Sequence, residues 1–301
     1  METELTTVRN GRLIYRGVDA VRVARNATVE DTAALLWHCA PLKPVRPRTR
    51  LAEGETGKAR AFEYLSQRAA TAPPLSGATR DELAEIGAEL LIGFADAVSG
   101  IRGRGLFHQR LARFWGLDPN GVDLLRRTLV LVADHELNPS SFSARVTAST
   151  GASLAACALS GYATLTGPRH GEASARALEF LKSQLGRDPN KEACTPAVPS
   201  DQTPAIGQAL DPNGDPRAKS RRRRMNLEPD LKRASKAAER NGQERANVDM
   251  ALAALCLKLD LPNDAPFLIF ASGRLVGWIA HAIEQTLSGK MIRPRAKYLG
   301  K

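Results

Sequence analysis

The spacing of apolar residues along the chain predicts helices almost throughout. After position 79, apolar side chains recur every three or four residues, the period of a helix buried on one face: Leu83, Ile86, Leu90, Leu91, Phe94 and Val98. Thr79 with Glu82, and Thr28 with Asp31, each form the Ser/Thr-x-x-acid pattern that caps a helix N-terminus. A further helix is predicted after Pro266, through Ile269, Leu275, Val276, Ile279 and Ile283.

The remaining segments complete the prediction of an all-α fold. Residues 142–167 are small and apolar on nearly all sides, so we expect them inside, packed against other helices. Residues 12–17 (RLIYRG) are the one convincing strand, a short hairpin arm. Proline-containing stretches at 40–60 and 186–216 are expected to be irregular. A long irregular segment in a helical protein favours a binding loop for the second stretch.

Composition excludes several classes of protein. The chain has 301 residues, enough for one large core or two domains, and its 43% hydrophobic and 25% charged residues are typical of globular proteins. Arg274, His281 and Glu284 interrupt the most apolar stretch, so no membrane span is expected. The first ten residues are polar and do not resemble a secretory signal, which favours a cytoplasmic protein.

The cysteines are widely spaced and form no CxxC pair: Cys39, Cys157, Cys194 and Cys256. Such a pattern is typical of small, reduced core residues. We therefore expect neither a metal site nor a disulfide.

Much of the net charge of +11 comes from residues 219–245, which contain ten Lys or Arg residues but only four Asp or Glu residues. A solvated helix face is the favoured interpretation, and phosphate binding, to a nucleotide-containing ligand or to nucleic acid, is the alternative. The stretch contains no aromatic residue to stack on bases and no known nucleic-acid-binding motif, so a nucleic-acid partner is not expected.

Candidate chemistry gathers at three places. His135 lies in DHELNPSSF, where polar residues follow an apolar run, and His170 lies in TGPRHGEASAR, before a helix expected to start near Glu172. Backbone N–H groups at such a helix mouth favour negative charge. Asp249 precedes a long apolar stretch, so it either caps that helix or, partly desolvated, has the raised pKa of a general base. Three histidines resemble ordinary helix residues: His38, His108 and His281.

Several arginines are framed by glycine or proline: Arg217, Arg274, Arg293 and Arg295. A guanidinium group presents parallel N–H donors that match the two oxygens of a carboxylate. These side chains are therefore candidate ligands for an acidic substrate.

Seven phrases, in order and nearly end to end, resemble the citrate synthase family. They are LIYRGVDA, VEDTAALLW, the segment from DHELNPSSF through TGPRHGEASARAL, GDPR, NVDMALAAL, GRLVGWIAHAIEQ and RPRAKYLG. The resemblance implies an all-α homodimer with a large domain at 1–171 and 256–301 and a small domain at 172–255 that closes over the active site. It also implies an acyltransferase that condenses acetyl-CoA with oxaloacetate to citrate and CoA. Some relatives use propionyl-CoA and form 2-methylcitrate.

The same resemblance implies roles for individual residues. Asp249 corresponds to the base that deprotonates the acetyl methyl group, and His170 to the neutral donor to the thioester oxygen. His135 corresponds to an oxaloacetate ligand, and Arg217 and Arg274 to carboxylate ligands. Arg293 would enter the site of the partner subunit. Acetyl-CoA is a co-substrate, and neither a bound cofactor nor a metal is implied.

The chain departs from the family pattern at several positions. Gln208 stands where a histidine polarises the ketone of oxaloacetate, and loss of one such donor typically costs about 10²–10³ in rate. Glu172 replaces a glycine, Met250 replaces an aromatic residue, and residues 186–206 do not resemble the family's CoA-contacting segment. The amide of Gln208 can still donate a neutral hydrogen bond. A non-catalytic protein that binds a dicarboxylate or a CoA ester is therefore the alternative to the enzyme.

Overall fold

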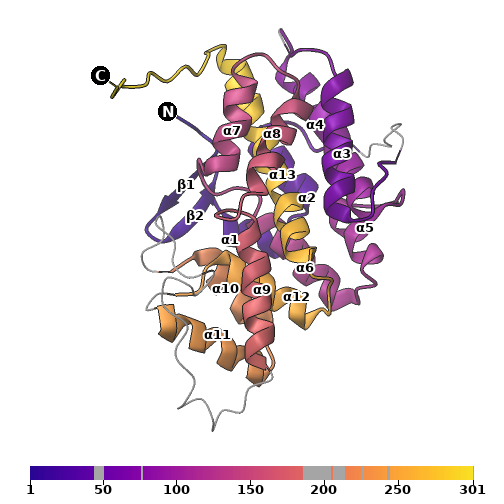
Figure 1. Ribbon diagram of the computed structural model, residues 1–301. Helices are drawn as coiled ribbons and strands as arrows, with labels where there is room; N and C mark the ends of the chain where they lie inside the picture. The colour runs from indigo at the N-terminus through magenta and orange to yellow at the C-terminus, as the bar shows by residue number, and fades with distance from the viewer. Residues whose placement is uncertain are drawn as a thin grey trace.

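Helices surround one long, buried helix in the computed structural model of the protein (Figure 1). The structure describes residues 1–43, 51–75, 77–185, 205, 214–225, 227–242 and 245–300. The first helices are α1 (Ala20–Asn26), α2 (Val29–Trp37), α3 (Gly57–Thr71), α4 (Arg80–Ser99), α5 (Phe107–Phe114), α6 (Pro119–Leu131) and α7 (Pro139–Ala148). The remainder are α8 (Leu154–Leu165), α9 (Glu172–Leu185), α10 (Pro216–Met225), α11 (Pro229–Gly242), α12 (Val248–Lys258) and α13 (Ala265–Ser288). The predicted all-α class is confirmed.

The N-terminus forms a small antiparallel sheet in the order β1 (Thr6–Arg9), β2 (Arg12–Tyr15) and β3 (Val18–Asp19). Arg9 pairs with Arg12, so Asn10 and Gly11 form a two-residue turn, and both have positive φ. Asn-Gly favours this kind of turn because both residues tolerate left-handed backbone. The predicted strand is thus confirmed, with a partner on each side.

Both predicted capping boxes are present. The Thr28 hydroxyl accepts a hydrogen bond from the backbone N–H of Asp31, and the Asp31 carboxylate accepts one from the N–H of Thr28. Thr79 and Glu82 make the same exchange at the start of α4. These local bonds fix where α2 and α4 begin, since a helix N-terminus leaves its first N–H groups without intrahelical acceptors.

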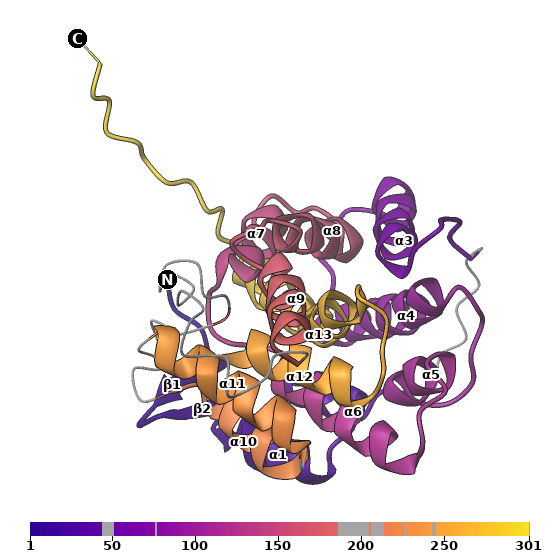
Figure 2. The same cartoon turned by 60° about the horizontal axis from the view of Figure 1, so that its bottom comes forward.

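Helix α13 is the centre of the core. It contacts α2, α4, α6, α7, α8, α9 and α12, and Figure 2 shows it between the α7–α8 pair and the helices below.

By length and composition, α13 is apolar enough to cross a membrane. The expectation from the sequence that its polar residues rule out a membrane-spanning length was therefore too strict. Its most apolar part is entirely buried within the protein, and the buried core helix of a globular protein can have the same length and composition.

Other boundaries differ from the predictions. Residues 142–167 form two helices, α7 and α8, and Phe142 is 40% exposed rather than interior. The predicted loop at 40–60 ends earlier, because α3 begins at Gly57 behind its cap, Thr56. Most of the irregular stretch predicted at 186–216, including Cys194, lies outside the described residues.

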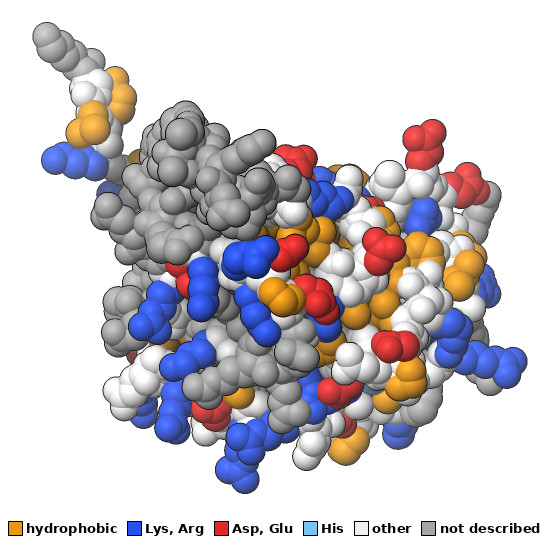
Figure 3. Space-filling view, turned by 90° about the horizontal axis from the view of Figure 1, so that it is seen from below, with side chains coloured by type: hydrophobic (Ala, Val, Ile, Leu, Met, Phe, Trp, Pro, Cys, Tyr) orange, Lys and Arg blue, Asp and Glu red, His pale blue; other side chains and the backbone are white. Residues whose placement is uncertain are grey.

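The basic stretch falls on α10 and α11, whose face carries many Lys and Arg side chains in Figure 3. On α11, Lys232, Arg233 and Lys236 are exposed while Leu231 and Ala234 are buried. This arrangement agrees with a solvated helix face. The proposed division into domains at 1–171 with 256–301 and at 172–255 stays a prediction.

Two glycines let α13 approach the turn that follows α6. A Cβ added at Gly273 would lie 2.6 Å from the carbonyl oxygen of Leu129, and one at Gly277 would lie 2.6 Å from Asp134 Oδ1. Ordinary side-chain contacts are far longer, so neither position has room for a methyl group. Because these two positions of α13 carry no side chain, the helix can pack directly against the 132–134 turn.

We predict that Gly277→Ala lowers the free energy of unfolding by about 1–3 kcal/mol, because the added methyl group overpacks this contact. Urea denaturation measures the change. Ser272→Ala, on the same helix, is the control: the Ser272 hydroxyl is buried without a hydrogen-bond partner among the described residues, so its removal should be close to neutral. Equal stability of Gly277→Ala and the parent protein would contradict the packing argument.

Candidate active site

His170 lies in the tight turn between α8 and α9. Its backbone N–H donates to the carbonyl of Gly167 (2.9 Å), and the N–H of Gly171 donates to the carbonyl of Leu165 (2.9 Å). A Cβ on Gly171 would lie 2.5 Å from that same carbonyl oxygen, so this close approach requires glycine. As predicted, the next helix begins at Glu172, whose carboxylate is ion-paired with Lys58 of α3.

The imidazole of His170 contacts a buried serine. His170 Nε2 lies 2.8 Å from Ser140 Oγ, which also accepts a hydrogen bond from Trp278 Nε1 (3.1 Å). Asn138 Oδ1 lies 2.8 Å from the same hydroxyl. The hydroxyl has one proton, which it donates either to Asn138 or to His170. Donation to Asn138 places the imidazole proton on Nε2, whereas donation to His170 places it on Nδ1.

His170 is neutral at physiological pH. Burial, together with the positive charge of Arg274, lowers its pKa from the ordinary 6.5 to about 4. Its ring also meets Phe270 edge to face, with 6.0 Å between ring centroids. The site therefore holds a neutral imidazole against an apolar wall.

Arg274 is near enough to act on three of the predicted site residues: His170, Arg217 and Asp249. It lies in the middle of α13 with 1% of its surface exposed, its Nε donates to the carbonyl of Val132 (2.9 Å), and its guanidinium lies 4.7 Å from the centre of the Phe270 ring. Burial lowers its pKa to about 10, and the charges of Asp134, Arg217 and Asp249 are near enough to act on it. Its Nη2 is buried with no hydrogen-bond partner among the described residues.

Arg217 lies in the first turn of α10 and makes a two-pronged pair with Asp215. Its Nε and Nη2 donate to the two carboxylate oxygens at 2.9 and 2.8 Å. Burial would raise the pKa of Asp215, but Arg217 and then His135 lower it below its ordinary value. The predicted carboxylate ligand thus already holds a carboxylate of its own chain, next to His135.

Asp249 lies in the first turn of α12. The N-cap of that helix is Asn247, whose side chain accepts the Asp249 N–H at 2.9 Å, so the capping interpretation of Asp249 was wrong. The helices that carry these residues pack together, since α12 contacts α9, α10 and α13. His135, His170, Arg217, Asp249 and Arg274 accordingly belong to one electrostatically linked cluster.

One predicted site residue lies away from this cluster, and another falls outside the described part of the chain. Arg293 is exposed on the C-terminal tail at 289–300, which extends away from the body of the protein (Figure 2). Gln208 lies outside the described residues, so its proposed role stays a prediction. Among the described residues, no group of three His, Cys, Asp or Glu side chains could hold a metal ion.

Sequence reasoning missed the hydrogen bonds that hold the His135 turn. Thr6 Oγ1 donates to Asp134 Oδ2 (2.5 Å) and accepts the backbone N–H of Glu136 (3.0 Å), while Val8 N donates to Glu136 Oε1 (2.6 Å). His281, assigned above to an ordinary helix position, is fully buried and places Nε2 3.3 Å from Asp134. Hydrogen bonds from strand β1 and α13 therefore hold Asp134 and Glu136, the residues on either side of His135.

The polar run DHELNPSSF was the available sequence signal for part of this arrangement, because Asn138 and Ser140 both belong to it. Thr6 and His281 carry no comparable signal. They lie more than a hundred residues from Asp134 along the chain and meet it only in the fold.

Comparison with known proteins identifies the family. Residues 97–295 match the family model described as citrate synthase, C-terminal domain, and the chain therefore belongs to the citrate synthase family. The citrate synthase of Haloferax volcanii is 35% identical over 199 residues, covering 62% of this chain and 52% of that protein. Citrate synthase 2 of Bacillus subtilis is 32% identical over 60% of this chain and 52% of its own length. The chain thus spans about half the length of these relatives.

A longer match is found with the 2-methylcitrate synthase of Shewanella oneidensis, which is 27% identical over 99% of this chain and 92% of that protein. Among solved structures, the citrate synthase of Thermotoga maritima superposes with a TM-score of 0.76 at 22% identity, covering 100% of this chain and 93% of that one. The Thermoplasma acidophilum citrate synthase, in a complex with carboxymethyl coenzyme A and oxaloacetate, has the same TM-score at 20% identity. These similarities show a shared fold.

We predict that Thr6→Val lowers the free energy of unfolding by about 2 kcal/mol, because it removes a buried hydrogen bond to a charged carboxylate. Burial would raise the pKa of Asp134, but His281, Arg274 and the Thr6 hydroxyl together lower it. A lowered pKa stabilises the fold above the unfolded value of about 3.9, so the Thr6→Val deficit should shrink as pH falls below that value. Urea denaturation at several pH values measures it.

Two other variants of strand β1 serve as controls for this experiment. Thr6→Ser keeps the hydroxyl and should retain most of the stability, and Thr7→Val changes an exposed position. If Thr6→Ser is as unstable as Thr6→Val, packing of the methyl group, and not the hydrogen bond, holds the turn.

Proposed function

We propose that the protein is a citrate synthase-type acyltransferase that condenses acetyl-CoA with oxaloacetate and releases citrate and CoA. The observation that carries this proposal is the placement of the buried Arg274, whose positive charge acts on the neutral His170 and which is itself acted on by the carboxylate of Asp249. Membership of the family supplies the reaction class. The enzymes of Haloferax and Bacillus named above are citrate synthases.

The chemistry needs a base and an oxyanion donor at the same carbonyl. Asp249 takes a proton from the methyl carbon of the acetyl group, and the thioester oxygen gains negative charge as the enolate forms. His170 donates a hydrogen bond to that oxygen, which is most effective in a site that excludes water. The enolate carbon then attacks the ketone carbon of oxaloacetate, whose oxygen takes up a proton and becomes the hydroxyl group of the product. Water then cleaves the thioester to give citrate and release CoA.

The tautomer of His170 follows from this role. Nε2 faces Ser140, so the nitrogen that meets the substrate is Nδ1, and it must carry the proton to act as a donor. That arrangement requires the Ser140 hydroxyl to donate to Nε2 instead of to Asn138 Oδ1, which still accepts the backbone N–H of Ser141. The lowered pKa keeps the imidazole from gaining a second proton at neutral pH.

The carboxylates of oxaloacetate suit the two buried arginines. Arg274 has an unpartnered Nη2 among the described residues, and Arg217 lies beside His135 and Asp215. A buried donor without a partner costs about 1–3 kcal/mol, which a bound carboxylate would recover. Arg293 from the partner subunit completes the site in the homodimer that we propose.

Two alternative functions are each supported by one observation. The match over nearly the whole chain to a 2-methylcitrate synthase favours propionyl-CoA as an alternative acyl donor. Gln208 in place of a histidine favours a slow enzyme or a protein that binds a dicarboxylate or a CoA ester without turnover. Ligand-dependent thermal stabilisation without CoA release would identify the second case.

The direct test is release of free CoA thiol from oxaloacetate with acetyl-CoA and, in parallel, with propionyl-CoA. We predict that His170→Asn and Asp249→Asn each lower kcat by at least about 10²-fold, since each removes a group required at the transition state. His38→Asn and Asp260→Asn make the same substitutions at exposed positions and should leave kcat unchanged. Thiol release that is unaffected by either site variant would contradict the proposed roles.

We further predict that Arg293→Ala is inactive alone and regains activity when mixed with His170→Asn under conditions that allow subunit exchange. Each mixed dimer then contains one site with both residues intact, so roughly a quarter of all sites become active by random pairing. Thiol release before and after mixing measures this recovery. Persistent inactivity of the mixture, with exchange confirmed by differently tagged subunits, would place Arg293 outside the partner's site.

A further inference from the structure

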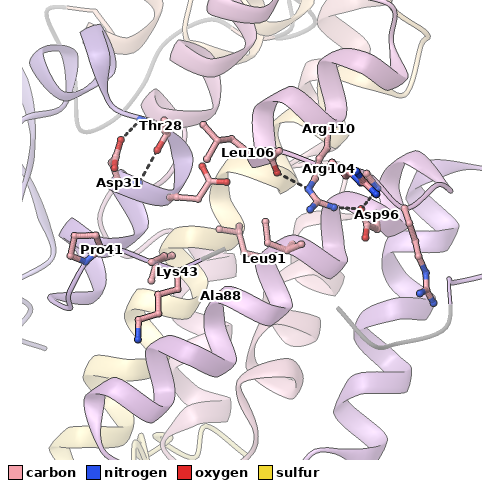
Figure 4. Close-up of a pocket in the computed structure, with 16 residues that line it drawn as sticks. Thr28, Asp31, Pro41, Lys43, Ala88, Leu91, Asp96, Arg104, Leu106 and Arg110 are labelled. Atoms are coloured by element: carbon pink, nitrogen blue, oxygen red, sulfur yellow. Dashed lines mark hydrogen bonds and ion pairs between the residues drawn. The ribbon is translucent and has the colours of Figure 1, made fainter. Parts of the chain in front are cut away.

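A cavity of about 760 Å³ lies between α2, the middle of α4 and the loop that leads into α5 (Figure 4). Its volume falls within the roughly 300–1,000 Å³ typical of small-molecule sites. Its lining includes none of the residues of the candidate active site. The cavity is therefore a separate feature of the fold.

One wall of the cavity is apolar. Ala88, Leu91 and Ile92 lie on one face of α4 at helical spacing, and Leu42 and Leu106 add further apolar surface. Leu106 is 37% exposed, an unusual position for a large apolar side chain beside a cavity. An apolar ligand body would remove this surface from water, at roughly 25 cal/mol per Å².

The acidic groups of the lining are already engaged within the protein. Asp96 is ion-paired with Arg110 (2.6 Å), as Figure 4 shows, and it also accepts the N–H of Gly103 (3.0 Å). Asp31 is the capping partner of Thr28 at the start of α2. Asp96 is thus charge-paired within the protein, and Asp31 is hydrogen-bonded at the helix cap.

Glu30 reaches from α2 to the start of α5, where a backbone N–H holds its carboxylate. Its Oε1 accepts the N–H of Phe107 (2.6 Å), and Oε2 is buried with no hydrogen-bond partner among the described residues. Burial raises the pKa of this carboxyl group.

The rim of the cavity is basic. Lys43, Arg102 and Arg104 are lining residues with exposed side chains. Asp96 is paired with Arg110, and the exposed ammonium of Lys43 and guanidinium of Arg104 favour an anion at this rim. An anionic group held at the rim leaves the rest of its molecule in contact with the apolar wall.

We propose that this cavity is a second ligand site, for an amphipathic anion whose apolar chain lies against α4 and whose carboxylate or phosphate meets the basic rim. Charge and shape both support this class over a neutral or cationic ligand. The site does not depend on the proposed enzymatic activity, because it shares no residue with the catalytic cluster.

Isothermal titration calorimetry with octanoate and octyl phosphate, each against acetate and octanol, tests the proposal. We expect at least one of the two amphipathic anions to bind about tenfold or more tightly than both acetate and octanol, and the stronger of the two identifies the headgroup. Saturating oxaloacetate alone and, in a separate titration, saturating acetyl-CoA alone should each leave this affinity unchanged. Displacement by either compound, or equal binding of octanol, would overturn the proposal.

Charge reversal at the rim locates the site. Lys43→Glu combined with Arg104→Glu should weaken binding of the preferred anion by about tenfold or more, because both side chains are exposed and act through charge. Arg9→Glu combined with Arg12→Glu makes the same change in net charge on the exposed N-terminal hairpin and should leave binding intact. Equal weakening by the two pairs, or none by the first, would refute a site at this cavity.

Discussion

Arg274 places a full positive charge inside the helical core, and much of the surrounding structure compensates that charge. Burial of an unpaired guanidinium costs several kcal/mol, so the residue is tolerated only with partners in fixed positions. The carbonyl of Val132, the carboxylate of Asp134 and the ring of Phe270 provide them. The turn at 132–134 must therefore lie against α13, and Gly273 and Gly277 make that approach possible.

The same charge determines the state of the candidate catalytic histidine. His170 is buried near Arg274, and both effects disfavour a second cation. The turn that carries His135 is held on its other side by the N-terminal hairpin, where the Tyr15 hydroxyl lies 3.0 Å from the carbonyl of Val130. A short sheet at the start of the chain thus supports, through hydrogen bonds, a site whose residues lie on helices and the turns between them.

Local features of this fold could be predicted from the sequence because their partners are close along the chain. The Thr28 and Thr79 capping boxes each involve residues three positions apart, and the start of α9 at Glu172 follows from the turn before it. The role of Thr6 could not be predicted, since its partners Asp134 and Glu136 are 128 and 130 residues away. For the candidate site, resemblance to the family indicated the residues, whereas their spacing alone left Asp249 as a possible cap.

Asp215, the aspartate of the GDPR phrase, connects the two segments of chain that carry Arg217 and Asp249. One carboxylate oxygen accepts Nε and the backbone N–H of Arg217, while the other accepts Nη2 of Arg217 and the N–H of Val248 (3.0 Å). Val248 is the first residue of α12, and Asp249 follows it. The start of α10 and the start of α12 are therefore joined at one buried carboxylate. A displacement of Asp215 would move the proposed base and the proposed carboxylate ligand together, so their relative position depends on a side chain that need not touch substrate.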